Sequence, residues 1–247
     1  MNCVSSLGNQ QLGQIWDWYE ATPSLRCGII TGAQAPGRRV AFCAGMDLKE
    51  WSESSSNPSS NRITDLSLSG GFAGLSTRRG KKPIISAVHG ICFGGGVEAA
   101  ANTDVVVAHR DSTFALPEPS RGVAAIAGVL PRLTLTLGLQ RASELALTGR
   151  VLMADEAREW GLVNDVVTGN VVDAALGWAA KITAQSPDSI IVTRSALRIV
   201  FDGDGVDEGM EKIKEGIWQD LRAGDNIREG LMAFVEKRAA KWKDSKL

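Results

Sequence analysis

The clearest pattern of apolar and polar positions lies between Lys82 and Glu118. Two short runs within it, 84–88 and 105–108, are almost wholly apolar. Continuous runs of this kind are typical of strands buried on both faces of a sheet. A triple-glycine turn and an Ala-rich helix separate them. The pattern therefore predicts a strand–turn–helix–strand unit, with the two runs as neighbours in one sheet.

Helical periodicity extends on both sides of this unit. We expect a helix over 8–20 and a buried strand over 27–31. Residues 138–162 predict a helix, a Thr-Gly-Arg turn and a second helix that Gly161 ends. Strands separated by helices, followed by helices alone, indicate an α/β domain with a helical addition. The purely helical part comprises the stretches 171–200 and 208–240.

Composition narrows the function classes. The 247 residues suffice for a sizeable core. With 27 basic and 28 acidic residues the net charge is −1, so we expect neither a nucleic-acid nor a membrane partner. No apolar run approaches the ~18 residues of a membrane span. The start of the chain also lacks the pattern of a signal peptide.

The thiols and imidazoles indicate no metal site. The cysteines form no Cys-x-x-Cys pair, and only two histidines accompany them, so a structural zinc is not expected. We predict free, mostly buried thiols in a reducing compartment. The residues concerned are Cys3, Cys27, Cys43, Cys92, His89 and His109.

The chain ends in Ser245, Lys246 and Leu247, after a charged and mobile-looking Lys-Trp-Lys-Asp segment. A terminal Ser-Lys-Leu is an address that the peroxisomal import receptor reads. The tripeptide therefore predicts a peroxisomal location, that receptor as a partner, and a eukaryotic source.

The candidate catalytic and binding residues lie at two predicted turns. The Gly94–Gly96 turn can stabilise a developing oxyanion or hold a phosphate, although a tight turn chosen for packing has the same sequence. Glu98 follows in the first helical turn, where an acid is also ordinary helix-start chemistry. Glu118 comes after Pro117 at the carboxyl edge of the sheet, where ligands collect in α/β proteins. Taken alone, Glu118 could equally be a solvated side chain.

Several segments together resemble the enoyl-CoA hydratase/isomerase (crotonase) superfamily. They are AFCAGMDLKEW, GICFGGGVEAA and FALPEPSRG, with GIITG, GVLPRL, RASELALTGRVLMADEAREWGLVNDVV and FVEKR along nearly the whole chain. The resemblance implies an α/β fold built as a spiral of repeated ββα units over 1–170, followed by a helical trimerisation region over 171–247. The family's usual strand pair ahead of MNCVSS has no counterpart here, which indicates truncation or an uncovered sheet edge.

The resemblance also implies a site for an acyl-CoA thioester, with coenzyme A as part of the substrate and no separate cofactor. The backbone N–H groups of Met46 and Gly95 would hold the thioester oxygen, and Glu98 and Glu118 would handle the protons of a water. Lys237 would reach the CoA phosphate of a neighbouring subunit in a homotrimer or hexamer, although a solvated helix lysine fits the same pattern. The implied substrate- and CoA-binding set is Ala44, Gly45, Asp47, Gly94, Phe234 and Lys237.

Hydration of a trans-2-enoyl-CoA to a 3-hydroxyacyl-CoA, in peroxisomal β-oxidation or secondary metabolism, is the activity we expect. Ile126 stands where family hydratases place a glycine that helps to hold the water. This difference keeps a Δ3,Δ2-enoyl-CoA isomerase and a specialised acyl-CoA dehydratase open as alternatives. The neutral charge disfavours a mere binding module. The Ser-rich insertion at 51–80 is either a lid over the site or a partly disordered segment, and the resemblance favours a mobile lid beside the acyl chain. The sequence does not define acyl length or branching.

Overall fold

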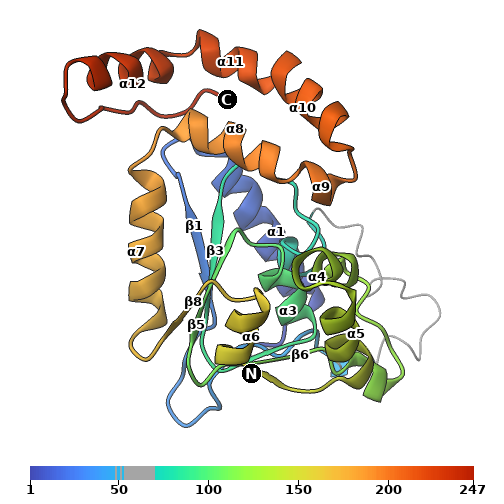
Figure 1. Cartoon of the computed structure of the whole chain (residues 1–247). Helices are drawn as coiled ribbons and strands as arrows, with labels where there is room; N and C mark the ends of the chain where they lie inside the picture. The colour runs from blue at the N-terminus through green and yellow to red at the C-terminus, as the bar shows by residue number, and fades with distance from the viewer. Residues whose placement is uncertain (48, 51, 53–69) are drawn as a thin grey trace. The chain divides into compact units, whose positions relative to one another are not determined.

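The structure is a computed structural model that describes residues 1–47, 49–50, 52 and 70–247 (Figure 1). Most of the expected lid at 51–80 lies outside these residues. The chain forms two compact units. One comprises residues 1–18, 29–79 and 84–176, and the other comprises 19–28, 80–83 and 177–247. No helix in the described part of the chain is long and apolar enough to cross a membrane.

Two four-stranded sheets form the centre of the first unit. One has the order β1-β3-β5-β8 and the other β2-β4-β6-β7. From β1 to β6, successive strands alternate between the sheets, which is the winding expected of repeated ββα units, whereas β7 follows β6 in the same sheet. The strands are β1 (Gly28–Thr31), β2 (Ala41–Cys43), β3 (Ile84–Val88), β4 (Ile91–Phe93), β5 (Val105–His109), β6 (Thr113–Ala115), β7 (Leu152–Met153) and β8 (Asp165–Val167).

The predicted apolar strands are neighbours, as expected. β3 and β5 pair in parallel from Ile85 opposite Val105 to Val88 opposite Ala108. Every residue of β3 is buried, because the strand has neighbours on both faces. The sequence pattern missed β4, which has only three residues and is too short to show a period. The unit around the triple glycine is therefore strand–strand–helix–strand.

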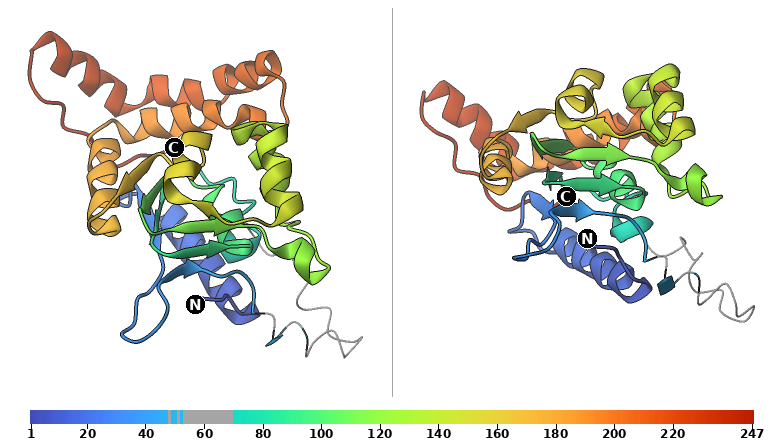
Figure 2. Two further views of the ribbon diagram at one scale, coloured as in Figure 1. Left: turned by 60° about the horizontal axis from the view of Figure 1, so that its bottom comes forward. Right: turned by 90° about the horizontal axis from the view of Figure 1, so that it is seen from below.

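Helices cover the strands of the first unit on two sides. Figure 2 shows α1 in blue on one side of the strands and α4 to α6, in yellow-green to yellow, on the other. The indole N–H of Trp16 donates to Ala73 O at 3.0 Å and fixes α1 against a short 3₁₀ turn. Gly161 ends α6 with φ 94°, which confirms the predicted C-cap. The elements are α1 (Ser6–Ala21), η1 (Phe72–Gly74), α3 (Gly95–Ala100), η2 (Glu118–Arg121), α4 (Val129–Leu137), α5 (Leu139–Thr148) and α6 (Ala154–Trp160).

The second unit is built mainly of helices, as the sequence indicates. The stretch expected to be helical over 171–200 is interrupted after residue 183, because Ser186 caps a new helix that opens with Pro187. Buried Asp188 and Asn226 join two of these helices through a hydrogen bond of 2.9 Å. The helices of this stretch are α7 (Val171–Thr183), whose first residues belong to the first unit, and then α8 (Pro187–Leu197), α9 (Ile199–Asp202), α10 (Val206–Glu215), α11 (Ile217–Ala223) and α12 (Asp225–Val235).

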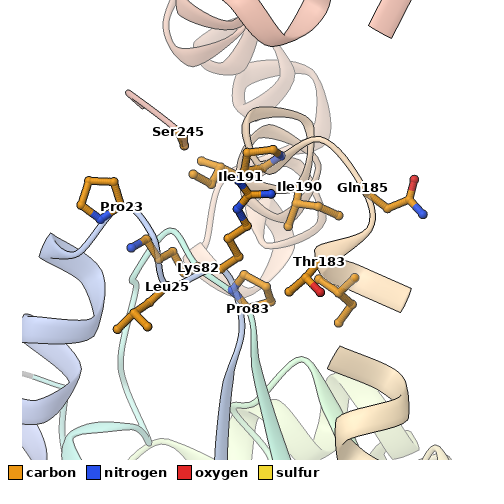
Figure 3. Close-up of a pocket in the computed structure, with 12 residues that line it drawn as sticks. Pro23, Leu25, Lys82, Pro83, Thr183, Gln185, Ile190, Ile191 and Ser245 are labelled. Atoms are coloured by element: carbon orange, nitrogen blue, oxygen red, sulfur yellow. The ribbon is translucent and has the colours of Figure 1, made fainter. Parts of the chain in front are cut away.

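The segment before the terminal tripeptide, which its composition made look mobile, contacts this unit through side-chain and backbone bonds. The Trp242 indole N–H donates to Ala184 O at 2.9 Å, and Arg26 pairs with Asp244 at 2.9 Å. Asn226 accepts a hydrogen bond from the Lys243 backbone N–H at 2.9 Å. Figure 3 shows Ser245 beside a small, mostly apolar pocket whose lining includes Pro23, Leu25, Pro83, Ile190 and Ile191.

Candidate active site

A cavity of about 1170 Å³ lies within the first unit. Residues from four separated stretches line it, namely 1–3, 38–49, 91–98 and 117–127, together with Phe72. Eight residues that the sequence predicts for the site meet in this cavity: Ala44, Gly45, Met46, Asp47, Gly94, Gly95, Glu98 and Glu118. The other two predicted residues, Phe234 and Lys237, belong to the second unit and do not line it.

The three glycines allow three close approaches. A Cβ on Gly94 would lie 2.8 Å from Glu118 Oε1, and one on Gly95 would lie 2.7 Å from the Phe72 ring. A Cβ on Gly96 would meet the Cys43 carbonyl oxygen at 2.5 Å. Gly95 and Gly96 are therefore required for packing, which agrees with the interpretation of this segment as a tight turn chosen for packing. Gly94 is required so that a carboxylate can lie against the turn.

Glu98 is the more deeply buried of the two carboxylates, with 6% of its surface exposed. Its Oε1 accepts the backbone N–H of Ala127 at 2.8 Å. Burial is the main cause that raises the pKa of Glu98 from 4.5 to about 7, and the charge of Glu118 raises it further, against the N–H groups of Ala127 and Val129. Glu98 is thus a carboxyl group that exchanges a proton near neutral pH.

Glu118 is half-buried, so it is not the solvated side chain that its sequence position also allowed. Burial raises the pKa of Glu118, while its own backbone N–H and the charge of Arg121 act in the opposite direction. Its Oε2 is buried and has no hydrogen-bond partner among the described residues. An unpaired buried carboxylate oxygen is costly unless a ligand or a water meets it. The charge of Glu118 also acts on Glu98, so the protonation of the two carboxyl groups is linked.

Within the part of the chain that the structure describes, the backbone N–H groups of Met46 and Gly95 have no hydrogen-bond partner, and both residues line the cavity. Val4 forms a parallel bridge with Met46, in which Val4 bonds the carbonyl of Gly45 and the N–H of Asp47. The N–H of Met46 consequently points away from this partner. Gly95 is the first residue of α3, where an N–H has no acceptor within the helix. A Cβ on Gly45 would lie 3.4 Å from Gly95 N, so the two predicted donor segments are in contact.

Sequence reasoning missed several residues of the cavity. Arg38, Arg39, Lys49 and Arg121 supply positive charge to its lining. The adjacent Arg38 and Arg39 were a sequence signal for a phosphate-binding site. They lie in a loop, however, and no periodic pattern predicts where the side chains of a loop point. Ile126 lines the cavity and is 74% exposed. The N–H that follows it, on Ala127, is the one that binds Glu98, so this loop positions a carboxylate by its backbone.

The cysteines are free, as predicted, but only two of the four are buried. Burial raises the pKa of Cys43 to about 11 and raises the pKa of Cys92 well above its ordinary value. Neither is a thiolate at neutral pH, which argues against a nucleophilic role for them. Cys3 is exposed and lines the cavity, and Cys27 is half-buried.

The model of the family Enoyl-CoA hydratase/isomerase matches residues 1–245, and the chain belongs to this family. Its relatives include mevalonyl-coenzyme A hydratase SIDH of Beauveria bassiana, 50% identical over 253 aligned residues that cover 100% of this chain and 88% of the relative. Carnitinyl-CoA dehydratase of Proteus mirabilis is 32% identical over 98% of this chain and 90% of its own length.

Solved structures agree with this assignment. An enoyl-CoA hydratase from Mycobacterium tuberculosis superposes with a TM-score of 0.84 at 33% identity, over 98% of this chain and 90% of that one. One from Mycobacterium marinum, EchA1, gives a TM-score of 0.84 at 35% identity over 97% and 89%. The expected crotonase-like fold is confirmed.

Proposed function

We propose that this protein catalyses the reversible addition of water to the 2,3 double bond of a 2-enoyl-CoA thioester. The observation that carries the proposal is the pair Glu98 and Glu118, which share one cavity beside the donor N–H groups of Met46 and Gly95. One carboxylate accepts a proton from water as its oxygen bonds to C3. The other, protonated, gives its proton to C2, so that water is added and the pair again holds one proton.

Negative charge develops on the thioester oxygen during this addition. Two preorganised N–H donors stabilise that charge, and removing one donor of this kind typically costs about 3–4 kcal/mol in other enzymes. Because both donors are backbone groups, the side chain of Met46 serves as cavity wall. The raised pKa values of both glutamates support the division of labour, since a coupled pair can hold one proton near neutral pH.

We further propose a six-carbon, hydroxylated acyl group, with a five-carbon chain and a methyl branch at C3. The relatives of Beauveria bassiana and Aspergillus fumigatus, 50% and 43% identical along this whole chain, are both named mevalonyl-coenzyme A hydratases. The corresponding reaction interconverts mevalonyl-CoA, a tertiary 3-alcohol, and 5-hydroxy-3-methylpent-2-enoyl-CoA. Dehydration and hydration are the two directions of one equilibrium, so the specialised dehydratase expected as an alternative is included.

The CoA moiety supplies three phosphate groups, and basic residues of the cavity suit them. We assign Arg38, Arg39 and Lys49 to these phosphates, because they line the cavity from the loop ahead of β2 and from the segment after it. Phe234 and Lys237 would contribute from a neighbouring subunit of a homotrimer or hexamer. We propose the peroxisome as the location of this reaction, on the basis of the terminal Ser-Lys-Leu.

The Δ3,Δ2-isomerase is the weaker candidate. It transfers a proton from C2 to C4 and requires one acid–base group, whereas two glutamates, Glu98 and Glu118, line this cavity. A straight-chain 2-enoyl-CoA, the substrate first expected from the sequence, is the second candidate within the hydratase class.

The test is an assay of the purified protein by loss of enone absorbance. Its substrates are 5-hydroxy-3-methylpent-2-enoyl-CoA, crotonyl-CoA and decenoyl-CoA. We expect the first ester to give the highest kcat/KM and a 3-hydroxyacyl product. Preference for decenoyl-CoA would overturn the acyl assignment alone. Deuterium uptake into the esters without any hydroxyacyl product would replace the hydratase by an isomerase.

A further inference from the structure

Arg121 is a charged residue of the cavity that neither the two-carboxylate chemistry nor the CoA assignment uses. It ends η2, the 3₁₀ turn that Glu118 begins. In a 3₁₀ helix, side chains three residues apart lie on the same side. Accordingly, Glu118 and Arg121 both line the cavity, and the charge of Arg121 acts on the Glu118 carboxyl.

Most of the Arg121 guanidinium is available for a ligand. One NH1 hydrogen bond to Pro117 O, at 3.1 Å, holds the side chain over its own turn. The guanidinium makes no second hydrogen bond and no ion pair within the described ranges. A guanidinium carries five N–H donors in a rigid fork, so donors remain beyond the one to Pro117. The Arg121 guanidinium is thus held in position by one hydrogen bond and still has N–H groups that can bind a ligand.

The chain that follows offers no competing polar side chain. Residues 123–127 line the cavity with valine, alanine and isoleucine side chains only. Two of their backbone N–H groups are already engaged: that of Val123 bonds Glu118 O at 3.2 Å, and that of Ala127 bonds Glu98. An oxygen carried on the acyl chain near this apolar wall would therefore find its side-chain donor in Arg121.

We propose that Arg121 is a specificity-determining residue that donates a hydrogen bond to an oxygen on the acyl chain beyond the reacting carbons. The inference rests on the proposed function and deepens it, because the 5-hydroxyl of a mevalonyl group is such an oxygen. Two bonds separate its carbon from C3, so the hydroxyl stays near the carboxylate that acts there. Arg121 is exposed to water in the protein without substrate. An acyl group that covers its guanidinium without offering an oxygen therefore removes the water and replaces it with nothing, which disfavours acyl groups that lack this oxygen.

The experiment compares two esters that differ in the distal hydroxymethyl group: 5-hydroxy-3-methylpent-2-enoyl-CoA and 3-methylbut-2-enoyl-CoA. For Arg121→Leu we expect kcat/KM on the hydroxylated ester to fall about 10- to 100-fold, the scale of a hydrogen bond to a charged group. The ester without the hydroxyl should fall far less, so that the ratio of the two values collapses. Arg121→Lys keeps the charge beside Glu118 and should lose part of the ratio with an unaltered pH profile.

Arg158→Leu is the matched control, because Arg158 is exposed on α6 and does not line the cavity. It should change neither value by more than about 2-fold. If wild-type protein hydrates neither ester, the proposed function fails. If it hydrates both and Arg121→Leu lowers them equally or leaves them unchanged, only the role of Arg121 is overturned. In the case of equal losses, the residue acts through a CoA phosphate or through the ionisation of Glu118.

Discussion

Glu118 Oε1 occupies the space that a side chain on Gly94 would need: a Cβ built on Gly94 falls 2.8 Å from it. Gly94 also has a φ of 55° and a ψ of −123°, a conformation that residues with a Cβ avoid. The carboxylate and the first glycine of the turn therefore define one another's position. Because Glu118 carries half of the proposed proton transfer, this contact links a backbone requirement to the chemistry.

We expect Gly94→Ala to lower both stability and hydration. The backbone strain should cost about 1–3 kcal/mol in the free energy of unfolding. The new Cβ should also displace the Glu118 carboxylate and so lower kcat, an effect that backbone strain alone would not produce. Urea unfolding and steady-state kinetics measure the two effects. Gly203→Ala is the control for strain, since Gly203 has φ 88° and no atom within 4 Å of its Cβ position. Unchanged kcat in Gly94→Ala would contradict the account.

The raised pKa of Glu98 should make the protein less stable as pH rises. Because its pKa is 4.5 in the unfolded chain and about 7 in the folded one, the folded state binds the extra proton between these values. The free energy of unfolding should therefore fall by up to about 3 kcal/mol as pH increases from below 4.5 to above 7. Glu98→Gln should flatten this slope and be more stable than wild type at pH 8.

Urea unfolding of both proteins at pH 5 and pH 8 gives the comparison. The two proteins should differ more at pH 8 than at pH 5. Parallel pH slopes would mean that burial does not shift the pKa of Glu98.

The sequence predicted the elements whose pattern is local. The apolar runs of β3 and β5 and the helix end at Gly161 needed no tertiary information. It could not predict β4, with three residues, or the docking of the tail, which depends on Arg26 and Trp242, 216 positions apart. Helical periodicity over 171–200 also did not reveal the interruption at Ser186 and Pro187.

For the site, the family resemblance predicted some residues and local sequence pattern predicted none of the others. The order of the motifs supports the family resemblance, and this resemblance predicts Met46, Gly95, Glu98 and Glu118 as site residues. All four line one cavity in the structure. The basic residues of the lining come from turns and loops, where neither periodicity nor motif defines where a side chain goes. Arg121 became notable only once the 3₁₀ turn placed it beside Glu118.

We expect the protein to form a homotrimer or hexamer through α12. This helix exposes a run of large apolar side chains, Leu231, Met232, Phe234 and Val235, which are 64%, 55%, 84% and 78% exposed. A contiguous exposed apolar patch of this kind is typical of an interaction surface. Light scattering on wild type should give a trimer or a multiple of it, and Phe234→Ser with Val235→Ser should lower the mass.

Leu147→Ser is the control, because Leu147 is 76% exposed on α5 of the other unit. In the assembled protein, Lys237→Ala should weaken CoA-ester binding by about 1–3 kcal/mol, more at low than at high salt. A fully active monomer would refute the interface. Unaltered affinity of Lys237→Ala at low salt would leave this lysine as a solvated residue.

Removal of Ser245, Lys246 and Leu247 should abolish peroxisomal import without altering purified activity. Lys246 of the tripeptide forms a largely exposed ion pair with Asp225, at 3.6 Å, and pairs of this kind add little stability. Ser245 lines the small pocket shown in Figure 3, which lies within the second unit and shares no residue with the active-site cavity. A fluorescent protein fused to the amino terminus should move from puncta to the cytosol when the tripeptide is deleted. A punctate distribution that persists in cells without the full-length protein would remove the proposed location.

The most direct test of the two-carboxylate mechanism is the hydration rate of Glu98→Gln and Glu118→Gln, measured with CoA-ester binding on the same samples. Glu159→Gln, an exposed glutamate of α6, serves as the control. Each cavity variant should lose about 10²-fold or more in kcat, the scale of a general acid–base group, while binding stays within a few-fold. Near-normal hydration by Glu98→Gln with an inactive Glu118→Gln would contradict the account and indicate a single-acid enzyme.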